Sequence, residues 1–189
     1  MFKKLKVRLK SITSMIHHNR RLADPLDEVA KQLAEISGKK KKTEADHKNM
    51  AHIEFVGGMH LGVDGLPIIP AEMIEATVIN AAKTQRKGAT YKTGITCEDI
   101  KLEYKGPKNP EKMWAQSDDF SIRVGVRIGN KVVMRTRPMF KQWEGELVVH
   151  YDDEIITSKK ELVSFIRVAG RQIGIGDWRP KFGRFEVVA

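Results

Sequence analysis

Apolar and basic residues alternate at the start of the chain. Leu5, Val7 and Leu9 are separated by basic residues, and further apolar positions follow as far as Met15. Side chains two apart in a strand point to the same face of a sheet. The segment 4–15 is therefore predicted to be a strand with one buried face and one basic face.

Apolar residues at helical spacing predict four helices. The first runs from Asp24-Pro25 to Ser37-Gly38, and a capping-box sequence, Thr43 to Asp46, starts a short second helix. The most regular pattern covers 70–83, where Pro70 precedes a repeating apolar face. The last helix begins near Thr157, and its buried side extends to Ile173.

Shorter alternating runs predict the remaining strands. Gly129-Asn130 separates two such runs by a tight turn, which predicts a β-hairpin over 120–140. The other predicted strands are a glycine-kinked segment at 53–63 and the segments 100–104, 144–151 and 185–187.

The order of these elements predicts an α+β fold. Antiparallel strands with two helices that cover one face indicate a ferredoxin-like or RRM-like (RNA-recognition-like) core. A helical hairpin is inserted after the first strand, and a glycine-rich loop precedes the last strand. We expect one domain over 1–189, with a basic helical insertion at 22–50.

Composition narrows the choice of partner and compartment. The 189 residues carry a net charge of +10, which suits a partner made of phosphates, although solubility or an acidic protein partner also explains it. The single cysteine, Cys97, excludes a disulfide framework and a cysteine-based zinc cluster. Lys6, Arg8 and Lys10 interrupt any secretion signal, and no long apolar run follows. These features predict a cytoplasmic protein without a membrane partner.

The last twenty residues combine glycines, an aromatic ring and positive charge. Glycines allow a close approach of the backbone, while a tryptophan and neighbouring cations suit a nucleic-acid strand. A helix stop and a core tryptophan are the alternatives. The candidate binding residues here are Gly174, Gly176, Trp178, Arg179, Lys181 and Arg184.

Basic residues elsewhere extend this candidate interface. Arg135 and Arg137 lie two apart on one strand, so both side chains are expected on one face. There they either bind successive phosphates or are ordinary surface charges of an edge strand. Trp143 is a second candidate for stacking, and Asp177 either lies at the site or pairs with an arginine to hold the loop. The remaining phosphate contacts are assigned to Arg20, Arg21, Lys39, Lys40, Lys41 and Lys42, although a lysine run is usually a solvated loop.

Two stretches resemble the RAMP superfamily, whose members include backbone subunits of CRISPR effector complexes. Gly65-Leu66-Pro67-Ile68-Ile69-Pro70 leads into a helix that ends at Lys83, and the segment 174–185 resembles the glycine-rich loop before that superfamily's last strand. The helix start departs from the pattern at Ala71-Glu72 and Glu75-Ala76. The resemblance implies a stand-alone, phage-encoded relative.

The resemblance also implies a function. It predicts a non-catalytic protein that coats single-stranded RNA, or DNA, through the backbone as a head-to-tail homo-oligomer or filament. One alternative is a phage factor that mimics or blocks a host defence protein. Another is an RNA endonuclease that uses His17, His18 or Asp24 in acid-base or metal-assisted cleavage. No cofactor, metal or catalytic residue is assigned.

Overall fold

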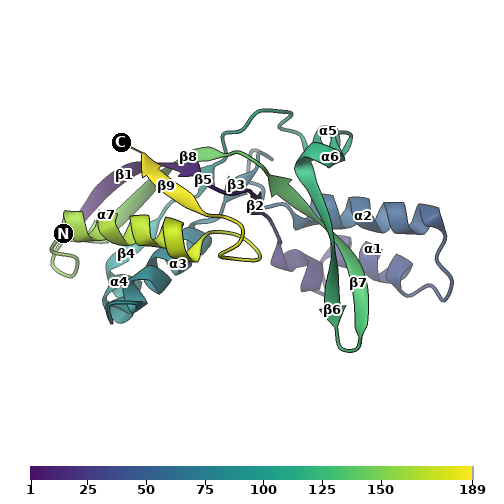
Figure 1. Ribbon diagram of the computed structural model, residues 1–189, viewed down its shortest axis with the longest axis horizontal. Coiled ribbons are helices and arrows are strands. Elements are labelled where there is room, and N and C mark those ends of the chain that lie inside the picture. The colour runs from purple at the N-terminus through teal and green to yellow at the C-terminus, as the bar shows by residue number, and fades with distance from the viewer. Residues whose placement is uncertain (189) are drawn as a thin grey trace. The chain divides into compact units, whose positions relative to one another are not determined.

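A four-stranded antiparallel sheet is built around β1 (Phe2–Ser11) in the computed structural model, which describes residues 1–188 (Figure 1). β8 (Glu144–Asp152) and β9 (Phe185–Val188) flank β1, and β4 (Ile95–Cys97) pairs with the far edge of β8. The order across the sheet is β4-β8-β1-β9. The strand predicted from the alternation at 4–15 thus forms the centre of the sheet.

Two helices connect these strands. α3 (Ala71–Lys83) lies between β1 and β4 in the chain, and α7 (Lys159–Val168) lies between β8 and β9. The two helices contact each other. Two β-α-β units with this strand order make up a ferredoxin-like fold. The predicted α+β class with a ferredoxin-like core is therefore confirmed.

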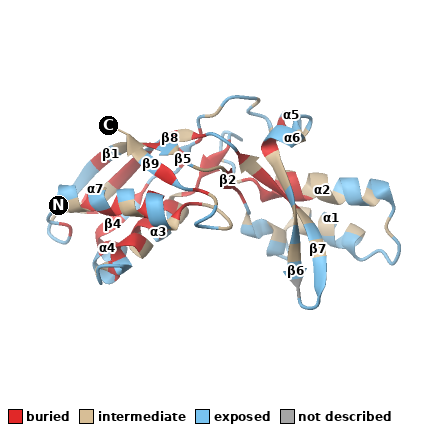
Figure 2. Ribbon diagram, in the orientation of Figure 1, coloured by how far each residue is buried: buried red, intermediate tan, exposed pale blue. Residues whose placement is uncertain are grey.

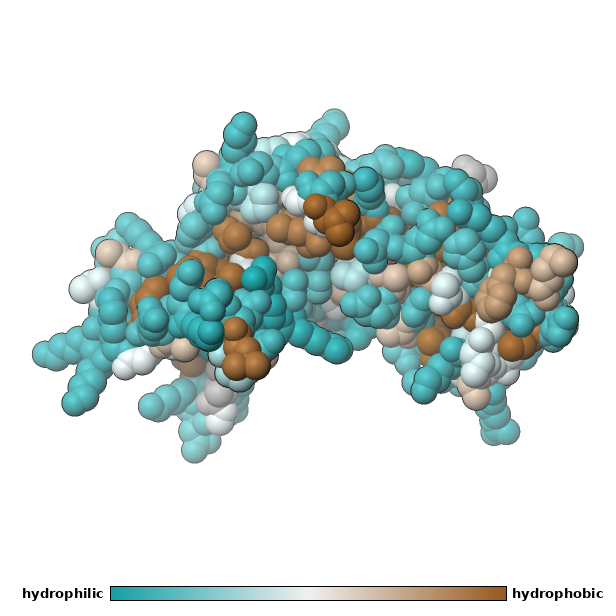
Figure 3. All heavy atoms as spheres, turned by 180° about the vertical axis from the view of Figure 1, so that it is seen from behind, coloured by the Kyte–Doolittle hydropathy of each residue, from teal (hydrophilic) through white to brown (hydrophobic). Residues whose placement is uncertain are grey.

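The core forms where the apolar faces of strands and helices meet. Leu5 and Leu9 of β1 are buried, as are Leu162, Phe165 and Ile166 of α7, because the spacing of each element gathers its apolar residues on one side. Figure 2 shows buried residues along the sheet and on the helices α3 and α7. Hydrophilic side chains cover most of the face seen in Figure 3, and apolar side chains form smaller groups there.

Contacts between residues divide the chain into two compact units. The first consists of 1–16, 61–105 and the chain from 141 onward, and the second consists of 17–60 and 106–140. Besides the sheet and its two helices, the first unit contains short elements: β2 (Met15–Ile16), β3 (Ile68–Ile69), α4 (Gly88–Gly94), β5 (Ile100–Lys101) and η2 (Ala169–Ile173), a π-helical continuation of α7.

The second unit joins a helical hairpin to a β-hairpin. α1 (Glu28–Ser37) packs on α2 (Glu44–Gly58), and α2 contacts β7 (Lys131–Phe140). β7 pairs with β6 (Ser121–Ile128) through the predicted tight turn, which confirms the β-hairpin. The short helices are η1 (Arg20–Ala23), α5 (Pro110–Trp114) and α6 (Ser117–Phe120).

Three predictions about local structure were wrong. The strand expected at 53–63 belongs to α2 for most of its length. Gly57 and Gly58 do not kink a strand there, but let the helix pack closely, because a Cβ at Gly57 would lie 2.6 Å from Val29 Cγ1. The helical segment is also longer than the 22–50 expected. The strand expected at 100–104 shrinks to the two residues of β5.

The start of α1 also differs. Asp27, not Asp24, is the N-cap, and its Oδ1 accepts a hydrogen bond from Val29 N at 2.8 Å. Asp24 instead accepts a hydrogen bond from Leu26 N in the preceding turn. No helix within 1–188 combines the length and apolar character needed to cross a bilayer.

Candidate nucleic-acid interface

The basic face of β1 is largely paired with carboxylates. Lys4 Nζ lies 3.1 Å from Glu98 Oε1, and Lys6 Nζ lies 2.9 Å from Glu146 Oε1. Arg8 forms ion pairs with both Glu103 and Glu144. Glu144 and Glu146 belong to the neighbouring strand β8, as in ordinary cross-strand pairs, whereas Glu98 and Glu103 follow β4 and β5, which are not neighbours of β1. The open face of the sheet is therefore a mixed-charge surface and not the cationic face expected from the strand alone.

The glycine-rich loop before β9 packs tightly on its own backbone. Gly174, Gly176 and Gly183 have φ values of 78°, 87° and 77°, a region that favours glycine. A Cβ at Gly176 would lie 2.4 Å from Ile16 O, and one at Gly183 would lie 1.6 Å from Ile175 O. These glycines thus allow close packing of the loop within the protein, and the binding role expected of Gly174 and Gly176 stays a prediction.

Backbone hydrogen bonds hold the same loop against 14–16. Asp177 N donates to Ile16 O at 2.9 Å, and Gly183 N donates to Ser14 O at 2.8 Å. Within the loop, Ile175 N donates to Gly183 O at 2.9 Å. These bonds fix the path of the backbone between the two outer glycines. The backbone positions from which the exposed side chains of this loop extend are therefore fixed.

Five side chains of this loop are exposed or partly exposed. The rings of Trp178 and Phe182 lie 6.2 Å apart between centroids, and Lys181 Nζ lies 5.7 Å from the centroid of Phe182. Arg179 and Arg184 are exposed nearby in the chain, and Arg184 Nε donates to Pro180 O at 2.9 Å. We call this set, Trp178, Arg179, Lys181, Phe182 and Arg184, the loop surface.

Sequence reasoning missed one member of the loop surface. Phe182 follows Trp178 by four residues in a segment bounded by glycines, and this spacing was the available signal. Trp143 was assigned in error. Its side chain is 1% exposed and packs against Phe185 at 6.2 Å between ring centroids, so it has no face for a base.

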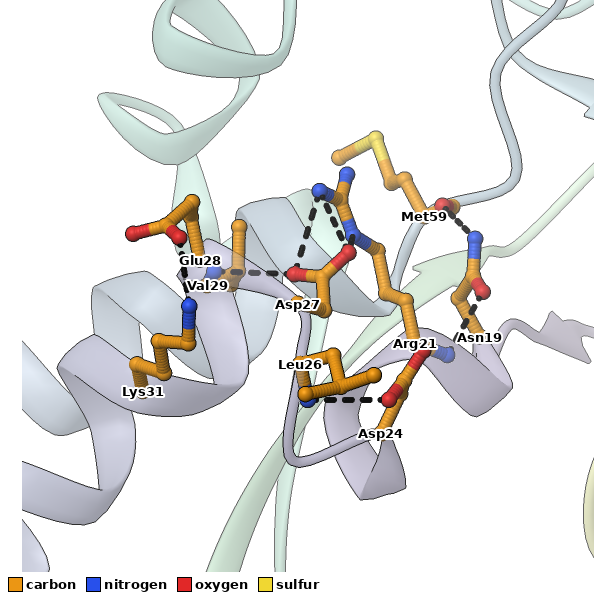
Figure 4. A network of polar contacts seen from close by, with 9 residues as sticks. All are labelled: Asn19, Arg21, Asp24, Leu26, Asp27, Glu28, Val29, Lys31 and Met59. Carbon is orange, nitrogen blue, oxygen red and sulfur yellow. Dashed lines mark hydrogen bonds and ion pairs between the residues drawn. The ribbon is translucent and has the colours of Figure 1, made fainter.

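Arg21 and Arg20 lie on η1 in the second unit. Arg21 Nε and Nη2 reach the two carboxylate oxygens of Asp27 at 3.0 and 3.2 Å (Figure 4). The guanidinium of Arg21 keeps the pKa of Asp27 below its ordinary value. Arg21 therefore ties η1 to the start of α1, whereas Arg20 is exposed.

The four lysines between α1 and α2 also differ in their surroundings, because two bond within the loop and two are exposed. Lys39 forms an ion pair with Asp46, which together with the backbone amide of Thr43 lowers the pKa of Asp46 to about 2. Lys42 Nζ donates to Lys39 O at 2.9 Å. Lys40 and Lys41 are exposed. Two of the four lysines thus contribute to the structure of the loop.

Arg135 and Arg137 do not form an exposed clamp. Arg135 Nη1 forms an ion pair with Glu54 Oε1, and Glu54 Oε2 accepts a hydrogen bond from Thr136 N at 2.7 Å. The Glu54 side chain is 6% exposed, and Arg137 is 9% exposed. The structure thus corrects this part of the predicted interface, because α2 places a buried carboxylate against β7.

The residues considered for cleavage lie in different environments. His17 is completely buried, and burial, together with the charge of His60, lowers its pKa well below the ordinary value. Its Nδ1 accepts a hydrogen bond from His60 N at 3.3 Å, and its ring lies 4.9 Å from that of Phe140. His18 is exposed, and Asp24 caps a turn. His17 therefore belongs to the core of the second unit.

Burial of His17 predicts a pH dependence of stability. The unfolded chain protonates this histidine near pH 6.5 and the folded chain does not, so stability should fall as the pH drops below that value, by up to about 1.4 kcal/mol per pH unit. Urea unfolding at neutral and mildly acidic pH measures the slope. His17→Phe should flatten it, whereas His47→Gln, at an exposed position, should not. An unchanged slope in His17→Phe would contradict this assignment.

Comparison with known proteins identifies the fold. No family model and no curated protein match this sequence. A chain of the Type III-B Cmr-beta bound to cognate target RNA, solved by cryo-EM, matches all of this chain with a TM-score of 0.57 and 10% identity. This chain corresponds to 59% of that longer one. Cmr6 from Pyrococcus furiosus matches with a TM-score of 0.42 and 9% identity, over 100% of this chain and 99% of its own. The first likeness shows that this chain shares the fold of that Cmr-beta chain, in agreement with the fold predicted from the two sequence stretches.

Proposed function

We propose that this protein binds single-stranded RNA through the RNA backbone, without cutting the strand, and that the loop surface is a central part of the binding site. The observation that carries the proposal is the pair of rings Trp178 and Phe182, with Lys181 over Phe182 and the exposed Arg179 next to Trp178 in the chain, on a loop with a fixed backbone. Aromatic faces accept any base by stacking, and neighbouring cations neutralise phosphates. The net charge of +10 and the fold shared with an RNA-bound Cmr-beta chain support the same partner.

The backbone of Trp178 supports a functional role for its ring. Trp178 has a φ of 54°, in the left-handed region, where a non-glycine residue costs about 1–2 kcal/mol. Strained backbone conformations cluster at functional sites, and Trp178 is one of two non-glycine residues with a positive φ among those described, together with Arg86. A glycine would relieve the strain, so the ring itself accounts for a tryptophan at this position in our proposal.

Assembly and location complete the proposal. Copies of the protein bind side by side along one strand as a head-to-tail homo-oligomer, as the RAMP resemblance implies, and the strand is bound in the cytoplasm. Sedimentation with RNAs of increasing length tests this assembly. The mass of the complex should rise in steps of one protein copy, whereas a constant mass with one copy would remove the oligomer from the proposal.

Replacement of the ring tests the loop surface. Trp178→Gly should weaken the binding of a labelled, unstructured RNA about tenfold, because stacking contributes about 1–3 kcal/mol per base, while thermal stability is retained or raised. Fluorescence anisotropy measures the affinity. Phe2→Ala, at an exposed aromatic residue outside the loop surface, is the control. Unchanged affinity in Trp178→Gly would overturn the role of the ring.

Salt dependence tests the cations in the same titration. Replacing Arg179 and Lys181 together by alanine should reduce the slope of log affinity against log salt by about 0.7 for each lost phosphate contact. Replacing Lys159 and Lys160, which are exposed in the first turn of α7, removes the same charge elsewhere in the first unit. Equal slopes for the two double variants would contradict the proposal. Recovery of intact RNA after incubation with magnesium checks the non-catalytic part.

A further inference from the structure

The second unit contains a groove that the loop surface does not explain. Its volume is about 510 Å³, within the usual range of small-ligand sites, and it lies between α2 and the β6-β7 hairpin. Three separate segments bring cations to it, because Lys42 precedes α2 while Arg123 and Arg135 lie on β6 and β7. Their side chains meet only through the packing of α2 on the hairpin.

The charge of the groove favours an anion. Glu54 is the carboxylate among the described residues that line it, and the buried oxygens of Glu54 already accept hydrogen bonds from Arg135 and Thr136 N. Three cations and one carboxylate leave two positive charges, counting His47 as neutral. Arg123 is exposed on the face of the hairpin that also carries Thr136, its cross-strand partner. A ligand with a phosphate group therefore meets an excess of positive charge.

The same groove has an apolar wall. Val132 is 71% exposed and Met134 is 48% exposed, although both line the groove together with Met50 of α2. Gly125 lies opposite Met134, and a Cβ there would be 2.8 Å from Val132 Cγ1. The glycine therefore leaves space for these two side chains on one face. Methionine adapts to flat ligand surfaces, and covering exposed apolar atoms is favourable.

We infer that this groove binds a nucleoside monophosphate unit, with the phosphate near Lys42 and Arg123 and the base against Val132 and Met134. A free nucleotide and the phosphorylated end of an RNA share this chemistry. The inference goes beyond the proposed function, because it uses residues of the second unit and none of the loop surface.

Calorimetric titration of the full-length protein tests the site. AMP should bind saturably at millimolar concentration or below, and adenosine and inorganic phosphate should each bind at least about tenfold more weakly, because each lacks one half of the contacts. Arg123→Gln should weaken AMP binding about tenfold through loss of a charge-assisted hydrogen bond. Arg20→Gln removes the same charge from an exposed position of η1 in the second unit, outside the groove lining, and should leave AMP binding unchanged.

Several outcomes separate this inference from the proposed function. Absence of AMP binding, equal binding of phosphate alone, or full binding by Arg123→Gln would overturn the groove. Trp178→Gly should retain AMP binding. If this variant lost AMP binding, the groove would not be a site separate from the loop surface. Met134→Ser, at an exposed position, should weaken the binding of AMP more than that of phosphate, and the reverse order would contradict the apolar wall.

The source of the ligand is tested with RNA. A preference for 5′-phosphorylated over 5′-hydroxyl RNA supports an RNA end as ligand, and equal binding supports a free nucleotide.

Discussion

Gly183→Ala is expected to destabilise the protein by about 2 to 5 kcal/mol, which adds the cost of a left-handed backbone to that of overpacking. Gly183 has a φ of 77°, and its added Cβ would lie 1.6 Å from Ile175 O. The neighbouring main chain cannot retreat without breaking the hydrogen bonds from Gly183 N to Ser14 O and from Ile175 N to Gly183 O. The loop surface would lose its support along with these bonds.

A matched control separates strain from crowding. Gly65 has a similar φ of 74°, but a Cβ there would meet no atom within 4 Å. Gly65→Ala should therefore cost about 1–2 kcal/mol for backbone strain only. Urea unfolding of both variants gives the difference in free energy. Equal destabilisation of the two would mean that crowding at Gly183 is relieved by small movements of the loop.

Glu54→Ala is expected to cost about 3 kcal/mol or more, which is the usual loss when one partner of a buried ion pair is removed. The substitution leaves the Arg135 guanidinium, whose side chain is only 30% exposed, without this carboxylate. It also removes the acceptor of Thr136 N. Both groups were desolvated when the helix packed on the hairpin, and neither cost is recovered by alanine.

Two further variants distinguish charge from packing at this position. Glu54→Gln keeps one acceptor oxygen for Thr136 N but removes the charge and places an amide NH2, which cannot accept, against Arg135 Nη1. Its stability should therefore lie between those of the original protein and Glu54→Ala. Glu44→Ala removes an exposed carboxylate that pairs with Lys48 on the same helix and should change stability little. If Glu54→Ala were no worse than Glu44→Ala in urea unfolding, the buried pair would contribute nothing.

The sequence by itself determined the elements whose signal is local. The period of two in β1, the tight turn between β6 and β7, and the helical spacing of α3 and α7 act within a few residues and therefore survive in the sequence. Their order was enough to predict the ferredoxin-like core. The segment at 53–63 misled the prediction, because glycines in a closely packed helix resemble those of a kinked strand.

Only the tertiary structure decided which cations pair with carboxylates and which segments the glycines pack against. Arg135 meets Glu54, 81 residues away in the sequence, and Lys6 meets Glu146, 140 residues away. The backbone that the glycine-rich loop approaches lies at 14–16, at the other end of the chain. Whether a cation can reach a phosphate depends on the carboxylate that the fold places opposite it, and this property is not local. For that reason the sequence was enough to locate a basic, aromatic loop, whereas the exposure of each of its residues depended on the fold.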